Sequence, residues 1–240
     1  MNATRILIAI AATVTLGWAG PAPQAPPQAP PDSEQRRPPD DSTDDATVHH
    51  PFDDIEMWAR AFDDPSRAEW QKPEEVVKAL GLSPGMNVAD IGAGTGYFNR
   101  LFAGAVAPGG KVYPADIEPK MVEHMKERAV KEKTPNVAPI LAAPDDPRLP
   151  EGAIDLILIC NTYHHIDNRL KYFDRLRKTL RPGGRIAIID YQKRDLPIGP
   201  SAEHKLSREQ IVAEMEAAGY HLVSEPAFLP YQYFLIFALK

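Results

Sequence analysis

A glycine-rich turn between an apolar run and a helical run constrains the fold of this chain more than any other feature. The turn reads Asp90-Ile91-Gly92-Ala93-Gly94-Thr95-Gly96 and overlaps the end of the apolar run 87–91. Glycine adopts backbone angles that other residues avoid, and its missing side chain lets a ligand approach the main chain. The helix that follows presents unpaired N–H groups at the same place. The pattern predicts a strand–turn–helix unit with a ligand at the turn.

Alternating strand and helix patterns follow this unit to the end of the chain. Apolar runs predict strands, and proline and glycine predict where the intervening helices begin and end. The run 154–160 is apolar except for Asp155, which is typical of a central parallel strand. The expected strands span 87–91, 111–117, 137–142, 154–160 and 185–189, and the expected helices span 53–62, 74–80, 97–106, 119–133, 169–180 and 207–218.

Two more strands, 221–228 and 231–239, are expected at the end, joined only by Leu229-Pro230. A link that short cannot cross over a sheet, so this pair is expected to be antiparallel. The predicted fold class is therefore α/β: a Rossmann-like, doubly wound, mostly parallel seven-stranded sheet with an antiparallel C-terminal hairpin.

Residues 1–19 have the pattern of a secretory signal peptide. Arg5 supplies a positive charge, 6–16 is an uncharged apolar run, and Gly17 and Ala19 are small residues suited to a cleavage site. An uncleaved anchor is the alternative, and both interpretations place the rest of the chain outside the cytoplasm, in the periplasm or secreted. No membrane span is expected in the mature chain.

Residues 20–48 predict a disordered linker, because they hold eight of the 25 prolines, an excess of acids and few apolar residues. The remaining 49–240 fits one domain, with a helical cover at 49–81 and a Rossmann-like core at 82–240. The single cysteine, Cys160, excludes an intramolecular disulfide and a cysteine-rich metal site. The net charge of −6 argues against a nucleic-acid partner.

The residues around the turn favour a ligand with a cationic part. Asp116 ends the next expected strand, near the position of an acid that binds a ribose diol. A dinucleotide fingerprint needs glycine at position 97, which is Tyr97, and the Asp90 carboxylate would repel a pyrophosphate. These features favour S-adenosylmethionine over NAD, so a dinucleotide oxidoreductase is the weaker alternative.

With these motifs the sequence resembles the class I S-adenosylmethionine-dependent methyltransferases, over roughly 73–240. The matching segments are 88–98 (VADIGAGTGYF), 112–121 (VYPADIEPKM), 149–157 (LPEGAIDLI) and 180–185 (LRPGGR). The resemblance implies that Asp116 binds the ribose hydroxyls and that Ile117 and Met121 flank the adenine. It also implies that the methionine end is held by Asp90 and the backbone of Gly92, Ala93, Gly94, Thr95 and Gly96.

Three further positions are predicted to contact the cofactor. Many relatives carry an acid after the third strand that bonds the adenine amino group, and here Asp145 and Asp146 follow that strand. Either takes this role or both are exposed turn acids. Asn161 is included because the carboxyl ends of strands line the ligand crevice of such sheets.

The catalytic candidates lie in the segment 160–167, which follows the fourth expected strand. His164 and His165 are candidate general bases, because histidine exchanges a proton near neutral pH. Tyr163 is a candidate for orienting the acceptor, with core packing as the alternative for it and for one histidine. If His49 or His50 met these histidines and Asp53, the imidazoles and the carboxylate could bind a transition metal. No metal is predicted, because adjacent histidines point in different directions and rarely both bind one ion.

The sequence as a whole predicts an S-adenosylmethionine-dependent methyltransferase that acts on a small molecule. Methyl transfer is an in-line displacement, so the protein mainly aligns the reactants, and a base is needed only where the acceptor starts protonated. An export signal conflicts with a cofactor made in the cytoplasm. The alternative is therefore an exported module that keeps the fold and binds a ligand without turnover.

Overall fold

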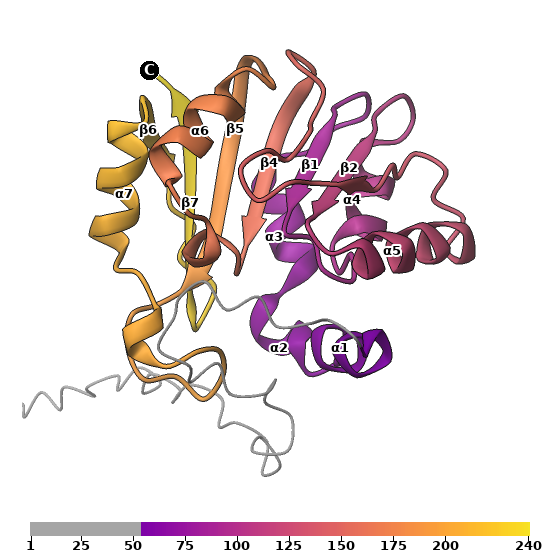
Figure 1. The fold of residues 1–240 in the computed structure, drawn as a ribbon, viewed down its shortest axis with the longest axis horizontal. Coiled ribbons are helices and arrows are strands. Elements are labelled where there is room, and N and C mark those ends of the chain that lie inside the picture. Colours follow the sequence, from indigo (N-terminus) through magenta and orange to yellow (C-terminus); the bar gives the residue numbers. More distant parts are fainter. Residues whose placement is uncertain (1–53) are drawn as a thin grey trace, which may run out of the picture.

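The computed structural model describes residues 54–240 and contains one seven-stranded sheet (Figure 1). The strand order is β3-β2-β1-β4-β5-β7-β6. Strands β1 to β5 run parallel, and β7 is antiparallel to both of its neighbours, which confirms the predicted fold class. The strands are β1 (Val88–Ile91), β2 (Val112–Asp116), β3 (Ile140–Leu141), β4 (Ile154–Cys160), β5 (Leu180–Tyr191), β6 (Tyr220–Ser224) and β7 (Gln232–Leu239).

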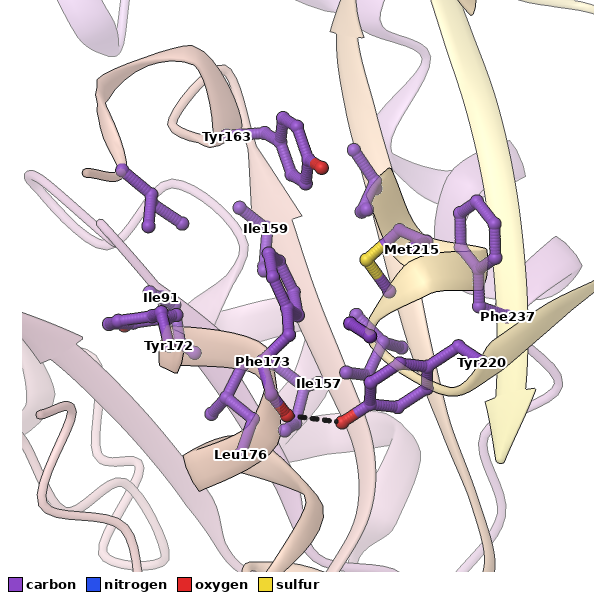
Figure 2. Packing of buried hydrophobic residues seen from close by; sticks show 14 of the residues in the cluster. Ile91, Ile157, Ile159, Tyr163, Tyr172, Phe173, Leu176, Met215, Tyr220 and Phe237 are labelled. Atoms are coloured by element: carbon purple, nitrogen blue, oxygen red, sulfur yellow. Dashed lines mark hydrogen bonds between the residues drawn. The ribbon is translucent and has the colours of Figure 1, made fainter. Parts of the chain in front are cut away.

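Helices pack on both faces of the sheet. On one face α6, α7 and the short 3-10 helix η2 enclose an apolar cluster, part of which is drawn in Figure 2. On the other face α3 and α4 enclose a second cluster. The helices are α1 (Ile55–Phe62), α2 (Arg67–Gln71), α3 (Pro73–Leu80), α4 (Asn99–Val106), α5 (Pro119–Lys131), η2 (Tyr163–His165), α6 (Arg169–Arg177), η3 (Ala202–His204) and α7 (Arg208–Ala217).

The central strand β4 has the predicted bounds, and the structure explains its one charged residue. The Asp155 carboxylate accepts a hydrogen bond of 2.6 Å from the backbone N–H of Asn87 and an ion-paired bond of 3.0 Å from Arg181. A carboxylate at the start of a buried strand is tolerated when its oxygens are paired in this way. Asp155 therefore joins β4 to the segment that enters β1.

Several elements differ from the expected ones. Strand β3 keeps only two residues, and Val137 makes an isolated bridge to Val112. Strand β5 begins at Leu180 rather than 185, because Leu180 pairs with Ile154 before the register shifts. Helix α2 was not predicted, and α6 ends at Arg177 rather than 180.

The C-terminal hairpin is antiparallel as predicted, but its connection is longer than the expected Leu229-Pro230 link. Strand β6 ends at Ser224, after a register shift between Leu222 and Ser224, and β7 begins at Gln232. Pro226 lacks the N–H that a continuing ladder needs, so the strand cannot extend to 228.

The predicted leader 1–19, the linker 20–48 and the residues His49, His50 and Asp53 lie outside the described residues. Within 54–240, no helix is long and apolar enough to cross a membrane.

Candidate functional site

The glycine loop leaves the end of β1 and folds over the end of β2. The N–H groups of Gly92 and Ala93 both donate to the carbonyl of Ala115, at 2.9 and 3.2 Å. The N–H of Gly94 donates to the Asp116 carboxylate at 2.8 Å, and the same carboxylate accepts from the N–H of Glu118 at 3.0 Å. Asp116, the acid that was predicted to bind a ribose, therefore lies in direct contact with the loop.

Gly92 is a position where the structure has no room for another residue. Its φ is +67°, and a Cβ there would lie 2.3 Å from both the Oγ1 and the Cγ2 of Thr162. Thr162 belongs to the segment after β4, where its hydroxyl donates to the carbonyl of Cys160 at 3.1 Å. The glycine loop and the segment that carries the histidines are thus packed against each other.

Asp90 is buried at the base of the loop, with 3% of its surface exposed. Burial raises the pKa of this carboxyl from 3.8 to about 7, while the nearby positive charge of Arg67 opposes that shift and the negative charge of Asp116 adds to it. A carboxyl that is easily protonated when the site is empty becomes ionised when a cation is brought beside it. Asp90 is therefore suited to a ligand that carries a positive group.

His164 is held by a carboxylate that the sequence analysis did not identify. Its Nδ1 lies 2.9 Å from both carboxylate oxygens of Asp190, and its backbone N–H lies 3.3 Å from Oδ2. Asp190 is 4% exposed and sits near the end of β5. The available signal was an acid directly after the apolar run 186–189, because the carboxyl ends of neighbouring parallel strands lie together.

The other two catalytic candidates have different surroundings. His165 is exposed, and its ring centre lies 4.1 Å from that of His164. Tyr163 is fully buried in the cluster of Figure 2, with its ring 5.5 Å from Phe173. Its hydroxyl donates to the Glu214 carboxylate at 2.8 Å, and burial raises its pKa. This is the packing role that the sequence analysis gave as the alternative for Tyr163.

Asn161 lies in a chain of side-chain amides that it forms with the buried residues Gln232 and Gln71. Its Oδ1 accepts a bond of 2.6 Å from Gln232, and Gln232 in turn accepts one of 2.9 Å from Gln71. Its Nδ2 lies 3.4 Å from the hydroxyl of Tyr191. The chain joins α2 to the ends of β4 and β7, so it fastens the helical cover to the sheet.

The predicted adenine contacts fall into two groups. Met121 is buried in the first turn of α5, and Ile117 directly follows Asp116, so both stay close to the end of β2. Asp146 instead pairs with Arg175 at 2.7 Å and accepts from the N–H of Arg148. Asp145 is exposed and lies 3.7 Å from Arg175, as in the turn-acid interpretation.

The cover helices touch the glycine loop directly. The ring of Phe62, at the end of α1, would lie 3.4 Å from a Cβ placed on Gly94. Asp63 accepts from the Thr95 hydroxyl at 3.1 Å and pairs with Arg128 of α5 at 2.7 Å. Through these contacts the end of α1 packs against the glycine loop. The sequence predicted only that the segment 49–81 forms a helical cover, not which of its residues touch the loop.

Arg67 of α2 is a residue of this site that the sequence did not reveal, whereas Trp70 of the same helix could be expected to wall a pocket or to anchor the cover. The guanidinium carbon of Arg67 lies 3.9 Å from the ring centre of Tyr97 and 5.9 Å from that of Trp70. Arg67 also lies beside Cys160, whose thiol has a pKa that burial raises to about 12. No group of three or more histidine, cysteine or acidic side chains within 54–240 is placed to hold a metal ion.

Comparison with known proteins gives one consistent family. Residues 89–188 match the family model described as a methyltransferase domain. The ubiquinone/menaquinone biosynthesis C-methyltransferase UbiE of Ectopseudomonas mendocina is 28% identical over 123 residues, 51% of this chain and 48% of that enzyme. The arsenite methyltransferase of Halobacterium salinarum is 29% identical over 109 residues, 45% of this chain and 28% of that enzyme.

A solved structure extends the likeness to most of the domain. A SAM-dependent methyltransferase from Aquifex aeolicus superposes with a TM-score of 0.74 and 29% identity, and the match covers 78% of this chain and 99% of that one. By contrast, the chain spans about half the length of the first curated relatives it matches.

The site fits S-adenosylmethionine, the cofactor of these proteins. The loop has no room for a side chain at Gly92, Asp90 is suited to a cation, and the Asp116 carboxylate lies against the loop at the end of β2. The sheet order, the loop and the matches to known proteins agree. The chain therefore carries a methyltransferase domain at residues 89–188 and has the fold of the class I S-adenosylmethionine-dependent methyltransferases.

Proposed function

We propose that this protein transfers the methyl group of S-adenosylmethionine to a small molecule whose acceptor atom must first lose a proton. The observation that carries this proposal is the pair formed by His164 and Asp190. His164 follows Thr162 by two residues, and Thr162 packs against Gly92 of the glycine loop. A base is therefore held beside the region where the cofactor is expected.

S-adenosylmethionine, when bound, supplies a methyl group already activated by its positive sulfur. Asp90 and the backbone of the glycine loop would hold its methionine end, and Asp116 its ribose. Ile117 and Met121 would lie against the adenine, in the apolar surroundings at the start of α5. These residues bind and orient, and none of them changes its covalent bonds.

The chemistry of the chain itself is a proton transfer at His164. Asp190 accepts from Nδ1–H, so the lone pair of the neutral ring is carried by Nε2, which takes the proton of the acceptor. The carboxylate then stabilises the imidazolium that forms. Positioned bases of this kind contribute roughly 10²–10⁴-fold to a rate.

A hydroxylated, electron-rich compound is the acceptor class that best suits this arrangement. Phenolic and enolic hydroxyls become strong oxygen or carbon nucleophiles once they lose a proton, whereas a thioether has no proton to give. The likeness to a ubiquinone/menaquinone biosynthesis C-methyltransferase supports a small-molecule acceptor of this type.

Binding and turnover of the full chain test the proposal. S-adenosylmethionine should bind at micromolar concentrations by calorimetry, NAD should not, and Asp90→Ala should weaken binding. Product should then form from phenolic compounds in a mass-spectrometric screen. Binding without any turnover would favour the non-catalytic module instead, and absence of binding would refute the methyltransferase.

Variants of His164, Asp190 and His165 test which residue acts as the base. His164→Ala and Asp190→Asn should lower kcat by roughly 10²-fold or more, while the cofactor affinity stays within a few-fold of wild type. His165→Ala is the matched comparison, because its ring is adjacent but exposed. Equal losses in the His164 and His165 variants would contradict the assignment of the base to His164.

A further inference from the structure

Arg67 occupies a position that the residues of the glycine loop do not explain. It begins α2 in the helical cover, and its guanidinium carbon lies 3.9 Å from the ring centre of Tyr97, the first residue after the loop. Stacking on an aromatic ring fixes the plane of a guanidinium and leaves its edge for a ligand. Arg67 is thus held at the loop by a contact that uses none of its donors.

The donors of Arg67 are only partly used within the protein. One terminal nitrogen donates to the carbonyl of Phe62 at 2.8 Å, and the other lies 3.4 Å from the amide oxygen of Gln71. Its Nε is buried and makes no hydrogen bond within the described residues 54–240, although the Cys160 thiol lies beside the guanidinium. A guanidinium has five N–H donors, and a buried donor without a partner is unfavourable, so this edge is suited to an acceptor from outside the chain.

The charges around Arg67 describe the ligand. Asp90 lies near enough for the guanidinium to oppose the rise in the pKa of that carboxyl. A buried acid at the start of the glycine loop and a cation against Tyr97 at its end match a group that carries both signs of charge. The methionine end of S-adenosylmethionine is such a group, since it bears an ammonium and a carboxylate on the same carbon.

We propose that Arg67 binds the carboxylate of the methionine end of S-adenosylmethionine, so that helix α2 forms part of the cofactor site. This inference rests on the proposed function, because it takes that cofactor as the ligand. Each residue then binds the group of opposite charge: Asp90 binds the ammonium and Arg67 binds the carboxylate. The protein should consequently discriminate against ligands that lack the carboxylate.

Decarboxylated S-adenosylmethionine provides the decisive probe, because it keeps the sulfonium and the amino group and lacks only the carboxylate. Calorimetry on the full wild-type chain should show it binding at least roughly tenfold more weakly than S-adenosylmethionine. Arg67→Met should weaken S-adenosylmethionine and S-adenosylhomocysteine by at least roughly tenfold. The same variant should change the affinity for the decarboxylated probe by less than about threefold.

Two further variants separate a charge effect from a packing effect. Arg67→Lys keeps the charge and should retain more of the preference for the carboxylate than Arg67→Met does. Arg60→Met is the matched control, since Arg60 lies on α1 of the same cover with an exposed side chain that pairs with Glu56. This variant should bind all the ligands as wild type does. Melting temperature and circular dichroism check that each variant is folded.

The outcomes are distinct for the two proposals. If wild type binds S-adenosylmethionine and its decarboxylated form equally, or if Arg67→Met weakens both by the same factor, the role of Arg67 is refuted and the methyltransferase stands. If wild type binds none of these ligands, the proposed function itself fails. The comparison of ligands on wild type decides the matter even if Arg67→Met does not fold.

Discussion

Asp90 gives the site a pH dependence that follows from the burial of one carboxyl. Its pKa is raised to about 7, mainly by burial, so the carboxyl is largely protonated below that pH when no ligand is bound. A cationic ligand favours the ionised form, and binding therefore releases a proton. Affinity for S-adenosylmethionine should rise from about pH 5.5 to 7.5, by up to about tenfold per unit below the pKa, before the ligand's own amine deprotonates near about 8.

Calorimetry in buffers of different ionisation enthalpy measures both the affinity and the proton release. Asp90→Asn should bind more weakly, and its affinity should stay constant over the same range. Proton uptake by wild type, or an equal pH dependence in the variant, would show that another group titrates.

At this scale the sequence identified the residues of the loop but not the partners that define their chemistry. Asp90, Asp116 and His164 stood at recognisable positions in a known pattern. Asp190 stood in no such pattern. Its contact with His164 depends on the register of the parallel strands β4 and β5, in which Cys160 pairs with Ile189. Arg67 lay outside every motif, and only the packing of α2 brings it to Tyr97.

The glycine loop packs closely against the segment after β4 because Gly92 has no side chain at the point of contact with Thr162. Gly92→Ala must tolerate a positive φ and also a Cβ that lies 2.3 Å from two Thr162 atoms. We expect it to lower the free energy of unfolding by about 2–5 kcal/mol. Chemical denaturation of the purified protein measures this change.

Gly85→Ala is the control for the backbone contribution. Gly85 has a φ of +87°, but nothing lies within 4 Å of the Cβ that alanine would add, so about 1–2 kcal/mol is expected. Adding Thr162→Ala to Gly92→Ala should recover part of the loss, because two of the three crowding atoms are removed. Equal effects of the two glycine variants would contradict crowding by Thr162.

The amide chain between α2 and the sheet is the second link between elements that can be tested. Gln71 is fully buried, and Gln71→Leu leaves the Gln232 amide oxygen without its 2.9 Å donor. We expect a loss of about 1–3 kcal/mol in unfolding free energy. Gln210→Ala, on the exposed face of α7, should change it by less than about 0.5 kcal/mol. A loss no larger than that of the control would show that the chain does not stabilise the cover.

Elements were predicted best where apolar pattern and proline or glycine boundaries agreed. Strand β4 and the start of α5 at Pro119 came out as expected. Helix α2 was missed because five residues with Asp64-Pro65 before them and Pro73 after them give no helical period. Strand β3 was overestimated, because the apolar residues 137–142 indicate burial, whereas ladder bonds depend on the neighbouring edge of β2.

Over the whole molecule, the mostly parallel sheet with its antiparallel C-terminal hairpin followed from the sequence, whereas the position of the domain in the cell remains a proposal. We propose that the chain is exported and cleaved after Ala19, because Arg5, the apolar run 6–16 and the small residues Gly17 and Ala19 form the pattern of a signal peptide.

Expression of the full gene in a bacterium, followed by fractionation, tests this assignment. The mature chain should begin at Gly20 by intact-mass analysis and leave the cytoplasm. Replacing Ala19 by a bulky residue such as tyrosine should block cleavage and retain the precursor at the membrane. An unprocessed cytoplasmic chain would contradict export and would remove the conflict with cofactor supply.

The composition of the cover has an optical consequence. Of the three tryptophans, Trp58 lies on α1 and Trp70 on α2, and residues 82–240 contain none. The indole of Trp70 lies 5.9 Å from the Arg67 guanidinium and 6.2 Å from the ring of Tyr191. In a Trp18→Phe variant, the tryptophan fluorescence of the chain comes from the cover alone. The binding of a ligand at Arg67 can then be followed in time without an added label.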